Sequence, residues 1–340
     1  MIWIKLIALA WSSLLIGSAL ADQEHAVILL YHHVSEETPT STSVTPNQFA
    51  AHLEFIDQHG YEVLDLTTML QDLAAGKPVA KNAVAITFDD GYVSVLQHAA
   101  PMLAQRDWPF TVFVSTAQVG QGALFLDWQE LEKIGRLGGT VANHGLLHGH
   151  MAAPQKGESQ REWRRRVKNE ISQAQAELTD RLGYAPKMFA YPYGEYSHAL
   201  QSVVRDLGLS GLAQHSGAVG WQSDFTALPR HPFHTDAASL DRLAERLRTM
   251  PLDVRSDPAS GVLTSDQELV VELDIAEGAY HLDRLACFLR GEALPIPPNE
   301  RQFTLTLPDL DEGRNTWICT APAEAGGYAW WSHLILRHVP

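Results

Sequence analysis

Cysteines, basic residues and long apolar runs are all scarce in this sequence of 340 residues. Two cysteines are too few for a disulfide-dense scaffold or a four-thiolate zinc site. The 25 Lys and Arg residues face 40 Asp and Glu, and a formal net charge of -15 argues against nucleic acid or anionic lipid as a partner. After the first 21 residues, nothing resembles a membrane span. The full sequence is 45% hydrophobic, which is typical of a folded protein, and its length suggests about two domains.

The first 21 residues have the layout of a secretory signal. Lys5 precedes an apolar run over residues 6–16, and small residues lead to an A-x-A pattern at residues 19–21. We expect cleavage after Ala21 and a periplasmic or secreted protein. An uncleaved membrane anchor is the alternative.

Short apolar runs alternate with amphipathic stretches between about residues 26 and 235. Strands are predicted at residues 27–31, 62–64, 84–88, 111–114, 140–142 and 188–191, and helices at 49–59, 92–106, 128–137 and 162–182. Such alternation predicts an α/β fold with parallel strands under helices, as an open sheet or a barrel.

After about residue 255 the pattern becomes that of an all-β module. Apolar residues alternate with polar ones over 269–275 and again over 303–307. We therefore expect a first domain at 22–254, a linker near Asp253–Ser260, and a small β-sandwich-like domain at 255–340. Because export permits disulfides, we expect Cys287 and Cys319 to be bridged, with two buried thiols as the alternative.

The sharpest motif is an Asp-Asp-Gly sequence directly after the apolar run at 84–88. Asp89 and Asp90 stand at the C-terminal end of a predicted parallel strand, where α/β folds place active sites. Side chains alternate along a strand, and Gly91 allows the sharp turn that lets both carboxylates face one cavity. Helix capping is the plainer interpretation of a single Asp here.

A pair of histidines follows the next-but-one predicted strand. If the segment is helical, His144 and His148 can present both rings to one ion, although His150 offers a different pairing with His148. A polar surface is the simpler explanation of the histidines alone. Together with one Asp they form a three-ligand metal set with open positions, and the second Asp is a ready general base.

These motifs resemble those of the polysaccharide deacetylases, a carbohydrate esterase family with the nodulation-deacetylase homology domain. The resemblance covers about residues 26–231, and it implies a distorted (β/α) barrel. It implies further that Asp89 is the catalytic base and that Asp90, His144 and His148 hold one divalent metal ion, most simply zinc. Gly145 departs from the family pattern, which usually has Ser or Thr at that position.

A third stretch, Phe189 to Gly194, resembles the motif in which the family has Arg-x-Pro-Tyr. By this resemblance the backbone N–H of Tyr193 helps to hold the oxyanion. The Arg that normally steadies the base is missing. Arg230 is our candidate substitute within the substrate site, and a structural ion pair is the alternative.

The expected catalytic acid, a His near the end of the domain, is also displaced. His32, at the end of the first predicted strand, is our candidate, as in the subset related to poly-N-acetylglucosamine deacetylases. His33 is the second choice, and a capping role is the plainer interpretation. The resemblance implies metal-dependent deacetylation of an N-acetylated polysaccharide with release of acetate. The alternatives are a non-catalytic polysaccharide-binding protein and an O-acetyl-xylan esterase. Oligomeric state is not readable from the sequence.

Overall fold

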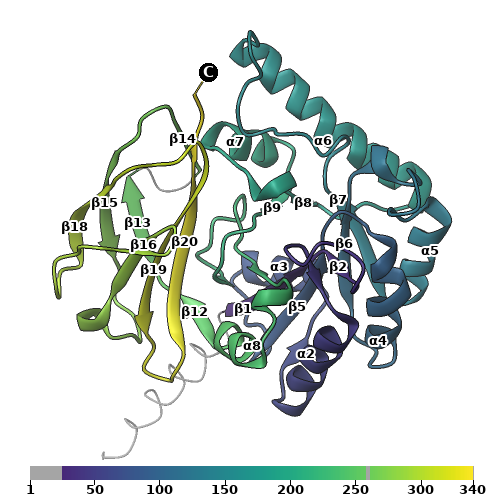
Figure 1. The fold of residues 1–340 in the computed structure, drawn as a ribbon, viewed down its shortest axis with the longest axis horizontal. Coiled ribbons are helices and arrows are strands. Elements are labelled where there is room, and N and C mark those ends of the chain that lie inside the picture. Colours follow the sequence, from purple (N-terminus) through teal and green to yellow (C-terminus); the bar gives the residue numbers. More distant parts are fainter. Residues whose placement is uncertain (1–24, 258–260, 340) are drawn as a thin grey trace, which may run out of the picture.

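The computed structural model describes residues 25–257 and 261–339, and the predicted signal lies outside them. Two parts pack side by side: a curled sheet surrounded by helices, and two smaller sheets formed by the C-terminal region (Figure 1). In the part of the chain that the structure describes, no helix is long and apolar enough to cross a membrane.

Parallel strands form the larger sheet. Its hydrogen-bonded order is β10-β1-β5-β6-β7-β8-β9, with β11 beside β1 and β4 beside β5. Only β10 runs antiparallel to its neighbour. The sheet curls into an incomplete barrel, so the predicted α/β barrel is confirmed. The strands are β1 His25–Tyr31, β4 Glu62–Val63, β5 Ala83–Phe88, β6 Phe110–Val114, β7 Gly139–Asn143, β8 Met188–Ala190, β9 Ser210–Leu212, β10 Ala218–Gly220 and β11 His231–Pro232; the short pair β2 His33–Val34 and β3 Ser43–Val44 lies apart.

Helices cover this sheet, close to the predicted positions. Three of them begin with a capping box, at Thr45, Asp127 and Ser159, in which two backbone N–H groups find side-chain acceptors. The predicted helix at 92–106 is a π-helical turn, Val95–Ala99, followed by a short α-helix. The α-helices are α2 Pro46–Gln58, α3 Leu66–Ala74, α4 Ala100–Ala104, α5 Trp128–Arg136, α6 Gln160–Leu182, α7 His198–Asp206 and α8 Leu240–Leu247.

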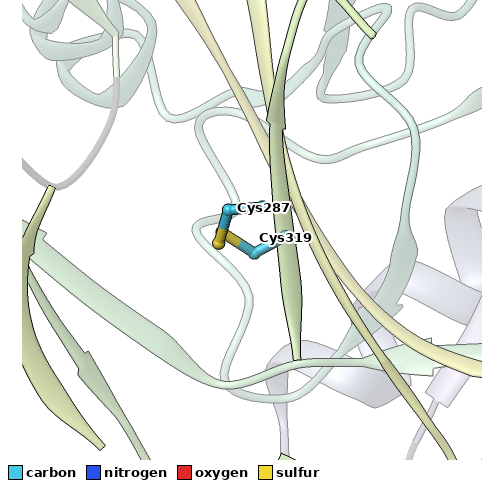
Figure 2. Close-up of a disulfide and its surroundings, with 2 residues drawn as sticks. All are labelled: Cys287 and Cys319. Carbon is cyan, nitrogen blue, oxygen red and sulfur yellow. A yellow bond between two sulfur atoms is a disulfide. The ribbon is translucent and has the colours of Figure 1, made fainter. Parts of the chain in front are cut away.

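The C-terminal region is a β-sandwich-like pair of sheets around its own apolar core. One sheet has the order β12-β20-β19-β16-β17 with β14 beside β20, and the other has the order β13-β15-β18. The disulfide between Cys287 and Cys319 is present and joins directly opposed residues of β16 and β19 (Figure 2). The strands are β12 Thr249–Pro251, β13 Val254–Asp257, β14 Val262–Thr264, β15 Leu269–Ile275, β16 Ala286–Leu289, β17 Glu292–Leu294, β18 Gln302–Leu307, β19 Gly313–Pro322 and β20 Tyr328–Arg337.

The linker predicted at Asp253–Ser260 is wrong over Val254–Asp257, which pairs with β15 as a strand, and residues 258–260 lie outside the described residues. β12, earlier in the chain, already belongs to the C-terminal sheet through its parallel pairing with β20. The strand Val254–Asp257 is so short that its alternation of apolar and polar residues cannot be distinguished from a loop in the sequence. The division of the chain at residue 254 stays a prediction.

β20 connects the two parts. The Ser332 hydroxyl donates a hydrogen bond to the backbone oxygen of Ser216, and the Tyr196 hydroxyl lies 3.1 Å from Nδ1 of His333. Trp330 faces the barrel, where the guanidinium of Arg246 lies 4.2 Å from the centre of its ring. The C-terminal region is therefore packed against the segment that follows β9.

Candidate active site

The predicted site residues meet at the carboxyl end of the parallel strands. His32 follows β1, Asp89 and Asp90 follow β5, His144 follows β7, and Tyr193 follows β8. Because neighbouring parallel strands end at the same edge of a sheet, side chains far apart in sequence are brought together here.

The backbone after β5 turns sharply, which separates the directions of the two carboxylates. Asp90 and Gly91 both have positive φ, of 71° and 69°. A Cβ on Gly91 would lie 2.7 Å from Cγ1 of Val114, so a larger residue fits poorly at this turn. The turn predicted at Gly91 is confirmed, and it begins one residue earlier than predicted.

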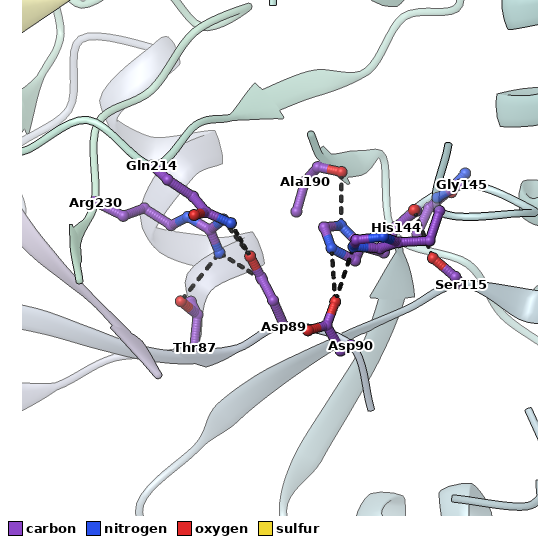
Figure 3. Close-up of polar contacts among 11 residues, drawn as sticks. Thr87, Asp89, Asp90, Ser115, His144, Gly145, Ala190, Gln214 and Arg230 are labelled. Atoms are coloured by element: carbon purple, nitrogen blue, oxygen red, sulfur yellow. Dashed lines mark hydrogen bonds and ion pairs between the residues drawn. The ribbon is translucent and has the colours of Figure 1, made fainter. Parts of the chain in front are cut away.

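Asp89 is completely buried and is held from two sides. Arg230, also fully buried, donates from Nη1 to Oδ1 at 2.8 Å and from Nη2 to Oδ2 at 2.7 Å (Figure 3). Gln214 Nε2 lies 3.4 Å from Oδ2. Burial raises the pKa of the Asp89 carboxyl, but the charges of Arg230 and His144 lower it more, so the net pKa is below its usual value. Asp89 is thus an ionised, fixed acceptor.

Asp90 faces the two histidines instead. Its Oδ1 lies 3.2 Å from Nε2 of His144 and 3.1 Å from Nε2 of His148, and all three ligand atoms lie within 4.8 Å of one another. Burial raises the pKa of Asp90, but its contacts with His144 and His148 bring it well below its usual range. Burial lowers the pKa of His144, while Asp89 and Asp90 raise it above normal. The group of Asp90, His144 and His148 therefore favours a positive charge between its three ligand atoms.

The donor set fits a divalent cation. Asp90 Oδ1 and His144 Nε2 are buried and, within the described residues, neither has a hydrogen-bond partner of acceptable geometry despite their short separation. Nδ1 of His144 lies 2.8 Å from the backbone oxygen of Ala190, which can only accept, so the ring's proton is on Nδ1 and Nε2 is available as a ligand (Figure 3). Two imidazoles and one carboxylate are a typical zinc ligand set.

The segment 144–148 is a turn and not the helix that we considered from its spacing. Gly145 and His148 have positive φ, of 85° and 56°, which places both rings on one side without helical geometry. The turn is fixed by its neighbours: Asn143 Oδ1 accepts from the Gly145 N–H at 2.7 Å, and the Ser115 hydroxyl donates to the His144 oxygen at 2.9 Å. The missing hydroxyl at residue 145 is thus offset by backbone and side-chain contacts.

His32 lies close enough to this centre to feel its charges. Burial lowers the pKa of His32, which outweighs the opposite effects of Asp89 and Asp90. His33 points elsewhere: its ring stacks on that of Tyr92 with centres 3.5 Å apart. Both aspartates act on the pKa of His32 and only Asp90 on that of His33, and the choice of His32 as the acid stays a prediction.

Tyr193 lies at the mouth of the site, 39% exposed and with a positive φ of 58°. Its ring meets the edge of His148 and stacks on His150, with ring centres 4.5 and 4.2 Å away. His150 in turn lies 2.7 Å from Oε2 of Glu195 and is not part of the ligand group. Within the described residues His148 groups with His144 and Asp90, and not with His150, the pairing that the sequence left open.

Two neighbours of the carboxylates were not found from the sequence. Gln214 contacts Asp89 across 125 residues, and Tyr92 lies near enough to Asp90 for this carboxylate to add to the effect of burial and raise the pKa of the Tyr92 hydroxyl. Of these two, only Tyr92 could have been found from the sequence, because it directly follows the Asp-Asp-Gly motif.

The fold and these residues define a barrel hydrolase with a candidate metal centre beside a fixed carboxylate. The family description "Polysaccharide deacetylase" matches residues 76–212, which include both aspartates and both histidines. Residues 76–212 therefore form a segment similar to the polysaccharide deacetylases, which are hydrolases.

Named relatives agree with this family. The chain is 25% identical over 236 residues to the poly-beta-1,6-N-acetyl-D-glucosamine N-deacetylase of Staphylococcus aureus, a match that covers 65% of this chain and 80% of the relative. It is 22% identical over 244 residues to the protein of the same name from Escherichia coli, covering 60% of this chain and 36% of the relative. Among solved structures, the deacetylase PplD of Streptococcus pyogenes, in complex with acetate, is similar in fold, with a TM-score of 0.59, 21% identity, and coverage of 66% and 98%.

Proposed function

We propose that this protein is an exported, metal-dependent N-deacetylase of N-acetylglucosamine polysaccharide. The observation that carries the proposal is the pairing of two differently placed carboxylates: Asp89 is fixed by Arg230, and Asp90 joins His144 and His148. The named relatives make a β-1,6-linked polymer the first substrate to test. The disulfide supports an oxidising compartment and hence export.

The candidate ligands would be Asp90, His144 and His148, with zinc as the first metal to test. A divalent cation there supplies Lewis acidity toward the acetamide carbonyl and makes water a better nucleophile near neutral pH.

Asp89 is the base. Its ionised carboxylate takes a proton from the water that attacks the carbonyl carbon, and Arg230 keeps its two oxygens in place during the transfer. The backbone N–H of Tyr193 donates to the oxygen on which negative charge develops.

His32 is the acid. The C–N bond breaks as the imidazolium of His32 gives a proton to the departing nitrogen, so that the products are acetate and a glucosamine unit. Because burial lowers the pKa of His32, its protonated form is a stronger acid than an exposed imidazolium.

Acetate release from β-1,6- and β-1,4-linked N-acetylglucosamine oligomers tests the proposal, with peptidoglycan and acetylxylan in the same panel. We expect release from the N-acetylglucosamine oligomers to stop with a chelator, to return with zinc, and to be lost in Asp89→Asn. The control is Asp107→Asn, an exposed aspartate whose positive φ of 54° Asn tolerates. Release that survives the chelator, or full activity in Asp89→Asn, would refute the mechanism.

A further inference from the structure

A second candidate site lies between the barrel and the C-terminal sheets. A cavity of about 450 Å³ is lined by the end of β10 and its following turn, by β12, by residues 277–280, and by β20. Its volume is within the roughly 300–1,000 Å³ typical of ligand pockets, and domain boundaries are frequent places for them. Its lining includes Trp221, Asp224, Asp253, Glu277, Tyr280 and Trp330.

This cavity is separate from the catalytic centre. His25 lines it, whereas Tyr31, at the other end of β1, precedes His32 of the catalytic centre. Six residue steps along a strand place these ends about 20 Å apart. The segment after β9 runs between the cavity and the catalytic centre. His215 lines the cavity, whereas the preceding residue, Gln214, contacts Asp89 in the catalytic centre.

Aromatic side chains give the cavity a surface suited to a sugar ring. Trp221 is 51% exposed, an unusual state for so large an apolar ring, and it lies at the solvent side of the lining. Trp330 is only 9% exposed, and the guanidinium of Arg246 lies 4.2 Å from the centre of its ring. The exposed ring of Trp221 is therefore an apolar platform of the kind that the C–H face of a sugar requires.

The charged groups of the lining are carboxylates. Asp224, Asp253 and Glu277 contribute to it, and no Lys or Arg does. Burial lowers the pKa of His215 to about 4 and that of His333 well below its usual value, so both rings are neutral near pH 7. Arg301 approaches Glu277 at 3.7 Å, but both groups are largely exposed and the pairing is weak. A cationic ligand is therefore favoured over a neutral or anionic one.

We propose that this cavity binds glucosamine units of the deacetylated polysaccharide, with the sugar ring against Trp221 and its ammonium group near the carboxylates. The choice of ligand rests on the proposed function, because deacetylation converts a neutral acetamide into an amine that carries positive charge at neutral pH. The site then holds the product chain while the barrel acts on a neighbouring stretch.

Calorimetric titration of the full chain tests the site, with chelator present so that no oligomer is hydrolysed. The probes are a β-1,6-linked glucosamine oligomer and its fully N-acetylated counterpart. We expect the glucosamine oligomer to bind more tightly, and to bind less tightly as salt is added. Trp221→Ala should weaken binding about tenfold, the loss of one aromatic contact. Glu277→Gln combined with Asp253→Asn should remove the preference for the amine.

Matched controls separate the cavity from the rest of the surface. Tyr328→Ala removes an aromatic residue of β20 that is 40% exposed and does not line the cavity, and Glu292→Gln removes an exposed carboxylate on β17. Both should bind as the unaltered chain does, and so should His148→Ala. Unchanged affinity in Trp221→Ala, equal binding of the two oligomers, or loss of binding in His148→Ala overturns the proposal.

Acetate release in the same variants distinguishes the two proposals. Trp221→Ala should release acetate from short oligomers at the unaltered rate. A chain that releases no acetate but binds glucosamine through Trp221 would refute the proposed function and leave the cavity site standing. Normal acetate release with no effect of Trp221→Ala on binding would support the proposed function and refute the cavity site.

Discussion

Arg230 holds both carboxylate oxygens of Asp89, although 141 residues separate them in the sequence. Both side chains are completely buried, and the Nε of Arg230 is itself fixed by a 2.9 Å hydrogen bond to the backbone oxygen of Ala213. The family pattern led us to expect an arginine before Pro192, whereas the arginine that contacts Asp89 here lies later in the chain, directly before β11. Arg230, directly before β11, therefore orients the carboxylate of Asp89 at the end of β5.

Replacing Arg230 tests that arrangement. Arg230→Met leaves a buried carboxylate unpaired, which should cost about 3–5 kcal/mol of stability. It also removes the charge that lowers the pKa of Asp89, so the pKa rises and the acidic limb of the pH–rate profile moves to higher pH. Arg230→Lys keeps the charge but loses the two-pronged contact, and its kcat should fall about ten- to a hundredfold with a smaller pH shift.

Thermal melting and the pH dependence of kcat/KM measure these effects. The control is Arg164→Met, which breaks an exposed pair with Asp206 and should change stability by less than about 1 kcal/mol. An acidic limb that stays in place in Arg230→Met would show that Arg230 does not set the ionisation of Asp89.

Removing one candidate metal ligand tests the Asp90–His144–His148 group independently of activity. The side chain of His148 is 15% exposed, so we expect His148→Ala to fold but to retain much less zinc than the unaltered protein. His150→Ala is the matched control, because this neighbouring histidine is 70% exposed and pairs with Glu195 instead. Elemental analysis after dialysis gives the metal content. Equal zinc in both variants would remove His148 from the ligand set.

The sequence predicted most of this centre because its signals are local. The buried run at 84–88 followed by two Asp and a Gly identifies a strand end and its turn, and alternation over 269–275 identifies a half-buried strand. The contacts of Asp89 with Gln214 and of Ser332 with Ser216 have no local signal, since they depend on how the barrel closes and on where β20 packs. The same holds for the cavity near Trp221. The helical expectation for 144–148 failed because positive φ at His148 cannot be read from its spacing.

The buried histidine His52, which contacts Tyr31, should make folding sensitive to acid. Tyr31 Oη donates to Nδ1 of His52 at 2.9 Å, and Nε2 of His52 donates to the Ala238 oxygen at 3.0 Å, which satisfies the neutral ring. Burial lowers the pKa of His52 from the value of 6.5 that it has when unfolded, despite the bond to Ala238. The unfolded chain therefore binds the proton first, and stability is full above about pH 6.5 and falls as the pH drops toward the folded pKa.

Melting temperatures between about pH 7 and about pH 5 check this. His52→Gln keeps a polar side chain but cannot titrate there, so its melting temperature should decline less steeply with acid than that of the unaltered chain. His59→Gln, at the exposed end of the same helix, is the control and should follow the unaltered chain. Parallel curves for all three proteins would exclude His52 as a source of acid sensitivity.

Two glycines with the same backbone conformation allow the positioning of Asp89 to be tested without touching a polar group. Gly194 and Gly208 both have a φ of 66°, so alanine at either costs about 1 kcal/mol of strain. At Gly208 a Cβ meets nothing within 4 Å, whereas at Gly194 it would lie 2.5 Å from Cβ and 2.9 Å from N of Gln214. Gly194→Ala must therefore displace the segment that contacts Asp89 and holds Arg230. We expect Gly194→Ala to melt at a lower temperature than Gly208→Ala, because the clash adds to the backbone strain that the two variants share. The kcat for acetate release should fall by roughly ten- to a hundredfold in Gly194→Ala alone. Equal kcat values would mean that the base tolerates movement of residues 213–216, and that its position depends on Arg230 rather than on this segment.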